Sequence, residues 1–347
     1  MISLEEKFLV NILYRPASEI LNGVDIKSIN FEKLITLASG HLMLPALFFN
    51  IQKKKASYLF PEDFIAYIKN IFTINKARNE ILLAEAKQLS QLLVENNINH
   101  IFLKGTALLL SNVFEDIGER MIGDIDFIIQ HKDEEKIIRV LEKHNYRKKD
   151  SLKLFRLFKP KHLPRRVNEN KKIAIEPHLE LLSPGWRSIF NSKQLKQDFK
   201  KGVKTYKIPN ISFLVDHCIY AIQIPDKGFF TSYHSHRAIY DIYNLSCKKG
   251  LTMKNCTKDI YVKHFFLTIA KFNIFDLQIP SSKVKLYYDK CLRGLITFYY
   301  ILIIKNKFFV LIQLLFNTEL RKRALNKITY HYANKTLLNY IYRWVKI

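Results

Sequence analysis

The sequence predicts an α+β protein in which a small mixed β-sheet is flanked by an N-terminal and a C-terminal helical region. Two observations carry this prediction. Apolar residues recur at helical spacing through residues 3–97 and again beyond residue 210, whereas residues 98–182 contain short apolar runs typical of strands. We therefore expect a helical region at 1–97, a sheet-bearing core at 98–182 and a mostly helical domain at 183–347. A chain of 347 residues can bury a sizeable core and form about two domains.

The first helix has a start signal in Ser3 and Glu6, which stand three apart as in a capping box. The opening residues do not show the basic segment and apolar run of a secretory signal, so we expect a cytoplasmic protein. The four cysteines show no paired spacing, which argues against a disulfide framework or a zinc site built from them.

The core begins with an apolar run that ends in Lys104, Gly105 and Thr106 and then changes to helical spacing. This change predicts a strand, a tight turn and the start of a helix. Free N–H groups and the positive end of the helix dipole can bind an anion there, and Gly105 lets the backbone come close to it. Lys104 is expected either to contact a phosphate or to reach solvent. Thr106 is expected to cap the helix and to hydrogen-bond phosphate as well.

Asp124 and Asp126 stand two apart in a run that otherwise suits a buried strand. Side chains alternate along a strand, so both carboxylates are expected on one face. Adjacent carboxylates repel unless a cation lies between them or one is protonated, and a divalent metal is the simplest partner. An exposed strand end is the alternative. Arg120 is expected to pair with a carboxylate and hold the loop, in preference to a direct contact with nucleotide.

A second strand supplies a third acid. Glu176, His178 and Glu180 occupy alternate positions, and Pro177 indicates a strand edge or end. About fifty residues separate Asp126 from Glu176, which leaves room for one helix and one hairpin strand between them. We expect Glu176 to join the two aspartates, with His178 and Glu180 at the rim of the site.

The chain has a formal charge of +25, and basic residues crowd between residues 147 and 172, directly between the two acid-bearing strands, where they face only Asp150 and Glu169. This basic hairpin is predicted to bind an anionic partner such as triphosphate, nucleic acid or an acidic acceptor, or else to form a solvated face. We favour the solvated face slightly, because a charge run alone is weak evidence of binding. Its basic residues are Arg147, Lys148, Lys149, Lys153, Arg156, Lys159, Lys161, Arg165, Arg166, Lys171 and Lys172.

Two further segments leave alternatives open. The apolar run from Gly294 to Phe316 is interrupted by Lys305 and Lys307, so neither half is long enough to span a membrane. We favour buried helices there, and the alternative is a hairpin in residues 294–347 that makes peripheral contact with the inner membrane. His234 and His236 occupy alternate positions, but no residue near them in the sequence completes a metal shell.

These motifs resemble the nucleotidyltransferase superfamily of DNA polymerase β, and more narrowly a bacterial family of uncharacterised nucleotidyltransferases. The likeness extends to about residue 250 and rests mainly on Leu103 to Ala107, Arg120, Asp124 to Ile128 and Ile175 to His178. It implies a polymerase β-like core that uses an NTP such as ATP. It also implies two Mg²⁺ ions at Asp124, Asp126 and Glu176, with Lys104, Gly105, Thr106 and Arg120 on the nucleotide side.

The reaction implied by this resemblance moves an NMP to an acceptor hydroxyl and releases pyrophosphate. The acceptor is left open among a small molecule, a sugar, a protein side chain and an RNA end. One departure is Glu176, where such families usually have aspartate, because the extra methylene moves the oxygen by about a bond length. The alternatives are a catalytically weak, antitoxin-like binding module with a protein partner, and a basic protein that binds nucleic acid or a membrane surface.

Overall fold

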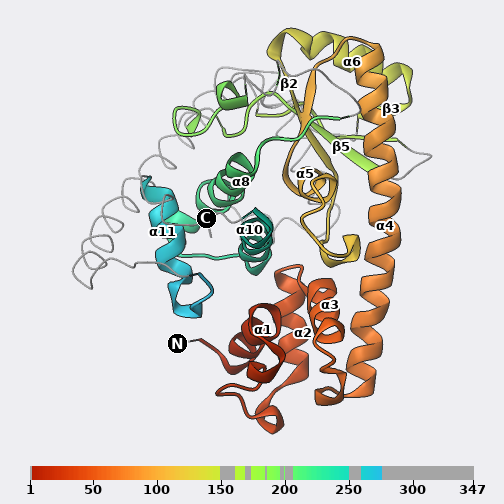
Figure 1. The fold of residues 1–347 in the computed structure, drawn as a ribbon. Helices are drawn as coiled ribbons and strands as arrows, with labels where there is room; N and C mark the ends of the chain where they lie inside the picture. Colours follow the sequence, from red (N-terminus) through yellow and green to blue (C-terminus); the bar gives the residue numbers. More distant parts are fainter. Residues whose placement is uncertain are drawn as a thin grey trace, which may run out of the picture. The chain divides into compact units, whose positions relative to one another are not determined.

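The computed structural model describes residues 2–148, 161–168, 173–183, 186–195, 199, 206–249 and 259–275 (Figure 1). These residues lie in one compact unit, Met1–Ile279. The predictions for residues 294–347, and for the basic residues within 149–160 and 169–172, fall outside the described residues.

The N-terminal region is built from four α-helices, α1 (Leu4–Tyr14), α2 (Phe31–Gly40), α3 (Leu44–Lys53) and α4 (Glu62–Glu95). Helix α1 begins where the sequence predicts, because the Ser3 hydroxyl accepts a hydrogen bond of 3.1 Å from the backbone N–H of Glu6. Helix α4 is 34 residues long and packs against α3 at one part of its length and α5 (Lys104–Leu110) at another (Figure 1). It therefore joins the helical region to the sheet.

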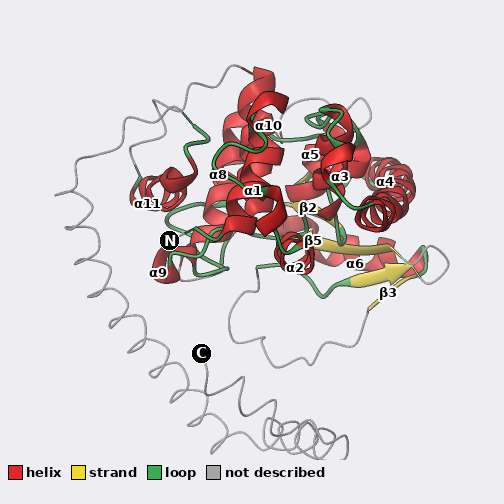
Figure 2. Cartoon of the chain, turned by 90° about the horizontal axis from the view of Figure 1, so that it is seen from below, coloured by secondary structure: helices red, strands yellow, loops and turns green. Residues whose placement is uncertain are grey.

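In the described part of the chain the sheet has five strands, namely β1 (His100–Phe102), β2 (Ile125–Ile129), β3 (Tyr146–Lys148), β4 (Arg166–Asn168) and β5 (Ile173–His178). Their order is β1-β2-β5-β4-β3. Only β2 and β5 pair in parallel, and the other neighbours are antiparallel. Figure 2 shows these strands confined to one part of a chain that is otherwise mostly helical.

Helix α6 (Glu134–Lys143) and the antiparallel strands β3 and β4 occupy the chain between the two parallel strands. The sequence predicted one helix and one hairpin strand in this interval; the helix is confirmed, and the structure has two strands where one was predicted. Pro177 lies next to the end of β5, past the last residue that pairs with β4. The prediction of a strand end at Pro177 is confirmed, whereas a sheet edge is wrong because β5 is the central strand.

The remaining described α-helices are α8 (Ile211–Gln223), α9 (Gly228–Thr231), α10 (His236–Lys249) and α11 (Ile260–Ile269). Asn210 caps helix α8, because its side chain accepts a hydrogen bond from the backbone N–H of Phe213. The helix packs against α5, α10 and α11. Short 3₁₀ turns complete the elements at Ala17–Glu19, Ile26–Ser28, Ser57–Leu59, Ile117–Glu119, His131–Asp133, Ser192–Leu195 and Ala270–Phe272. The predicted α+β fold, a small mixed sheet between helical regions, is confirmed.

Among the described helices, none is both long and apolar enough to cross a membrane on its own. The pair α2 and α3 meets that criterion jointly by length and composition, with a bend of 118° between the two helices.

Candidate active site

The site forms where the two parallel strands β2 and β5 run side by side. Their register places Asp126 directly opposite Glu176. The ammonium of Lys104 lies 2.7 Å from Asp126 Oδ1 and 3.7 Å from Glu176 Oε2. A cationic group is thus already held between two of the three predicted acids, which shows that the pair accepts positive charge.

His178 completes this cluster from the end of β5. Its Nε2 lies 2.8 Å from Asp126 Oδ1 and 3.2 Å from Glu176 Oε2. The ring is 1 % exposed, and Nδ1 has no hydrogen-bond partner among the described residues, so the contacts of Nε2 define its position. The expectation that His178 lies at the rim is wrong, since its ring lies between the acids, two residues along the same face from Glu176.

The charged groups of the cluster shift one another's pKa values. Burial raises the pKa of Asp126, but the hydrogen bond from His178 and the charge of Lys104 outweigh it and hold that pKa well below its usual range. Burial also opposes the charge on Lys104, and the nearby carboxylates reverse the effect, so its pKa is raised. The pKa of Glu176 is lowered because the hydrogen bond from His178 and the charge of His162 exceed the effect of burial. Asp126, Glu176 and Lys104 are therefore all charged at neutral pH.

Asp124 precedes β2 and stands apart from the closely spaced ligand atoms. Asp126, Glu176 and His178 each offer one ligand atom within 4.8 Å of the other two, and Asp124 does not belong to this group. Its carboxylate is 3.4 Å from the guanidinium of Arg165. Burial, followed by the charge of Asp126, raises the pKa of Asp124. The negative charge of Asp126 therefore acts on Asp124, although the Arg165 guanidinium faces the Asp124 carboxylate.

The predicted strand, turn and helix are confirmed as β1 and α5, but the turn is made by Lys104, not by glycine. Lys104 has φ +48°, in the left-handed region that side chains enter at a cost of about 1–3 kcal/mol. Gly105 is needed for space, because a Cβ there would lie 2.9 Å from the side chain of Ile122. This strained backbone carries the side chain that reaches both acids.

Thr106 does not cap the helix as the sequence predicted. Helix α5 begins at Lys104 with Leu103 as the cap residue, and Thr106 is fully buried inside the first turn. Its hydroxyl donates to the backbone carbonyl of Asp124 across 3.4 Å. The side chain therefore links the turn to the strand that bears the acids, while the backbone N–H groups of the first helical turn have no partner within the helix.

Arg120 holds the loop before β2, as expected, through a partner that the sequence did not reveal. Its Nε and Nη2 donate to the two carboxylate oxygens of Asp241 at 2.7 and 2.8 Å. Both side chains are buried, and Asp241 lies on α10. This bidentate pair fixes the loop against a helix that follows it by more than a hundred residues.

The described part of the basic hairpin reaches the site. Besides Arg165 at Asp124, His162 Nδ1 lies 3.7 Å from Glu176 Oε1. Burial, followed by the charge of Lys104, lowers the pKa of Lys161. Arg166 instead turns to Glu142, 3.0 Å away. The segment supplies positive charge on one side of the acids.

A small cavity of about 80 Å³ lies beside Lys104, between α5, α8 and α10. Its walls include Arg120, His217, Asp226 and Arg237. Burial and the charge of Lys104 lower the pKa of His217 to about 3, so this ring is neutral at physiological pH. Arg237 lies on α10 and lines this cavity together with Lys104.

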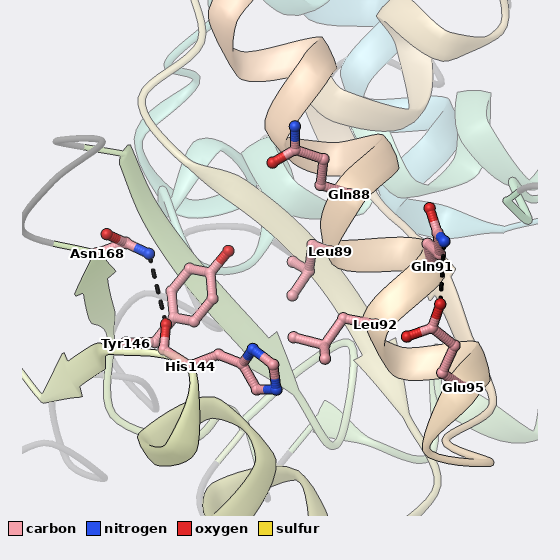
Figure 3. A pocket seen from close by; sticks show the side chains of 8 residues that line it. All are labelled: Gln88, Leu89, Gln91, Leu92, Glu95, His144, Tyr146 and Asn168. Carbon is pink, nitrogen blue, oxygen red and sulfur yellow. Dashed lines mark hydrogen bonds between the residues drawn. The ribbon is translucent and has the colours of Figure 1, made fainter.

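A second cavity, of about 270 Å³, lies between α4 and the β3–β4 end of the sheet (Figure 3). It is lined by Gln88, Leu89, Gln91, Leu92, Glu95, His144, Tyr146 and Asn168. It is larger than the cavity beside Lys104, but it contains none of the predicted site residues. We place the chemistry at the acids because the facing carboxylates and the bound ammonium are there.

A protein-family model for uncharacterised nucleotidyltransferases matches residues 27–251, which include the whole sheet and the first part of the C-terminal helices. The chain belongs to this family. Searches of the curated proteins and of the solved structures returned no significant match. The family makes the protein a nucleotidyltransferase in the general sense, with a nucleotide as its substrate.

Proposed function

We propose that the protein is a Mg²⁺-dependent nucleotidyltransferase that moves an NMP from an NTP to an acceptor hydroxyl and releases pyrophosphate. The observation that carries this proposal is the pairing of Asp126 with Glu176 across β2 and β5, with an ammonium held between them. The described part of the chain thus offers a preformed cation site next to a helix start. Both features suit a substrate that combines a metal ion with phosphate.

The residues fit Mg²⁺ by their chemistry. Mg²⁺ prefers oxygen ligands and is typically held by one or two carboxylates together with substrate phosphates. Asp126 and Glu176 would supply those oxygens, and Asp124 would join them once its carboxylate leaves Arg165. When bound, two such ions neutralise charge on the phosphates and on the attacking and leaving oxygens.

The chain's own residues have separate tasks in this reaction. Glu176 is ionised and accepts the proton of the acceptor hydroxyl, whose oxygen attacks the α-phosphorus while the bond to pyrophosphate breaks. Lys104 moves from the acids to the phosphates, and the backbone N–H groups of Gly105 and Thr106 face the same anion. His178 keeps Asp126 and Glu176 in position through Nε2.

Arg120 and Thr106 support the site from behind. Arg120 is engaged by both oxygens of Asp241, and the hydroxyl of Thr106 is directed to the carbonyl of Asp124. We therefore assign Arg120 to positioning the loop, and we assign only the backbone of Thr106 to phosphate binding. The cavity lined by Arg237 gives the triphosphate a further cationic wall.

The test is transfer of label from α-labelled ATP, CTP, GTP or UTP to an acceptor in cell extract with Mg²⁺ present. The purified protein should label an acceptor, and the double variant Asp124→Ala/Asp126→Ala should not. Equal labelling by both proteins, with no metal-dependent nucleotide binding by calorimetry, contradicts the proposal. A binding module would then be favoured, whereas salt-sensitive binding to nucleic acid or anionic vesicles that survives the double variant would favour a charge-driven role.

A further inference from the structure

A second cluster of metal-binding side chains lies outside the nucleotidyltransferase site. Glu6 Oε1 lies 2.9 Å from His234 Nε2 and 3.0 Å from His236 Nε2. The three ligand atoms fall within 4.8 Å of one another. Glu6 belongs to the first turn of α1, and the histidines stand at and just before the start of α10. The fold thus brings together residues that are separated by more than two hundred positions.

The sequence indicated the two histidines of this cluster but not its carboxylate. A capping box predicts that the Glu6 side chain turns back to the backbone of Ser3, and Ser3 does cap the helix. The Glu6 carboxylate instead extends to the two imidazoles. The sequence also showed nothing near His234 and His236 that completes a metal shell. The missing ligand comes from the opposite end of the described chain.

The spacing of the ligand atoms suits a tetrahedral metal ion. Bonds of about 2.0 Å from a tetrahedral Zn²⁺ to nitrogen and oxygen place neighbouring ligand atoms about 3.3 Å apart. The observed 2.9 and 3.0 Å lie a few tenths of an ångström below that value, which a small movement of the Glu6 side chain supplies. Both imidazoles direct the same nitrogen, Nε2, toward the carboxylate.

The surroundings hold the cluster and leave it accessible from one side. The His236 side chain is fully buried, whereas those of Glu6 and His234 are 14 % and 15 % exposed. The ring of Phe272 packs against both histidines. His41 Nδ1 accepts a hydrogen bond of 3.4 Å from the backbone N–H of His236. The imidazoles are thus fixed by packing, and an ion can enter beside Glu6.

We infer that Glu6, His234 and His236 bind a divalent transition-metal ion of the Zn²⁺ class. Two imidazoles and a carboxylate suit Zn²⁺, and three protein ligands leave a fourth position for water or a small ligand. The ion joins the start of α1 to the start of α10. Helix α10 also carries Asp241, which accepts two hydrogen bonds from Arg120. The metal therefore stabilises the position of α10, the helix that holds the loop before β2.

The test uses the full-length protein freed of metal with a chelator and then titrated with Zn²⁺, with bound metal counted by elemental analysis after dialysis. Glu6→Gln keeps the size of the side chain and an acceptor oxygen, so the fold is retained while a charged ligand is lost. His234→Asn removes a partly exposed ligand. Each variant should lose one equivalent of Zn²⁺, or bind it at least about tenfold more weakly, since even outer-shell changes cost roughly 10- to 100-fold.

A matched control is His131→Asn, because His131 Nε2 and Glu180 Oε1 also form a histidine–carboxylate contact, at 3.0 Å, but belong to no three-ligand group among the described residues. This variant should keep the wild-type stoichiometry. Zn²⁺ should also raise the thermal midpoint of wild type and of Asp126→Asn, but not of Glu6→Gln. The Asp126→Asn arm separates this site from the acids of the nucleotidyltransferase site.

Two outcomes overturn the inference. One is a wild-type protein that binds no Zn²⁺ beyond what Glu6→Gln and His234→Asn also bind. The other is a loss of the same equivalent in His131→Asn, which would mean that surface histidines bind the metal non-specifically. In either case the cluster is a hydrogen-bonded contact between α1 and α10.

Discussion

Replacing Lys104 with methionine should strengthen Mg²⁺ binding and weaken catalysis at the same time. In the structure the Lys104 ammonium contacts Asp126 at 2.7 Å and Glu176 at 3.7 Å. A metal ion must displace it from the same oxygens. Methionine has a similar length but carries no charge, so the variant removes this competition while His178 continues to support the acids.

The size of the effect follows from the contact that is lost. A hydrogen bond to a charged group contributes about 1.5–3 kcal/mol, and the 34 % exposure of the Lys104 side chain favours the lower end because solvent screens the charge. Each 1.4 kcal/mol corresponds to tenfold in affinity. Mg²⁺ should therefore bind the variant about tenfold more tightly in calorimetry without nucleotide, although NMP transfer should fall because the phosphates lose a cationic partner.

Lys76→Met is a suitable control, since Lys76 also contacts a carboxylate, that of Asp116, at 2.6 Å but lies outside the site. It should change neither Mg²⁺ affinity nor transfer. If Lys104→Met bound Mg²⁺ no more tightly than wild type, the idea that the lysine occupies the metal position would be refuted. Circular dichroism of both variants would exclude loss of fold as the cause.

Three further perturbations test the framework around the site. Asp241→Asn should lower the free energy of unfolding in urea by about 3–5 kcal/mol, because Arg120 then keeps a buried charge without its bidentate partner, and a change under 1 kcal/mol would contradict this role. Asp216→Asn should raise the denaturation midpoint at pH 8 and change it little at pH 3.5. Burial, followed by the charge of Asp259, raises the pKa of Asp216 in the native state from 3.8 to about 6. The protonated carboxyl therefore favours the native state below about pH 3.8, and this contribution to the free energy of unfolding is lost as the pH rises through 6. A stabilisation at pH 3.5 as large as at pH 8 would be inconsistent with that sign. Thr106→Val should leave the KM for nucleotide unchanged, since its hydroxyl faces the Asp124 carbonyl, and a large rise in KM would show direct contact with phosphate.

Local patterns were sufficient to predict the core of the fold. The change from an apolar run to helical spacing at Lys104 marks the end of β1 and the start of α5, and the strand-like run at Asp126 becomes β2. The alternation around Glu176 placed a third acid on a strand, and β5 sets it opposite Asp126. These predictions succeed because strand and helix periodicity follow from the backbone alone.

Long-range contacts were beyond this reasoning. The partner of Arg120 is Asp241, on a helix whose position depends on the packing of α8 and α10. His178 was expected at the rim because the sequence does not show how β5 is aligned with β2. The parallel pairing of these two strands brings the His178 ring to Asp126. Glu6 looked like a capping residue because its distant partners, His234 and His236, have no signature in the sequence near it.

The most direct test of the account is a comparison of label transfer from α-labelled and γ-labelled NTP, made with wild type, Asp126→Asn and Asp133→Asn. Asp133 is also a buried aspartate, but it precedes α6, outside the site. We predict that the α label alone reaches an acceptor, that Asp126→Asn abolishes the transfer and that Asp133→Asn retains it. Transfer that persists in Asp126→Asn, or that carries the γ label, would contradict a nucleotidyl-transfer centre built on Asp126 and Glu176.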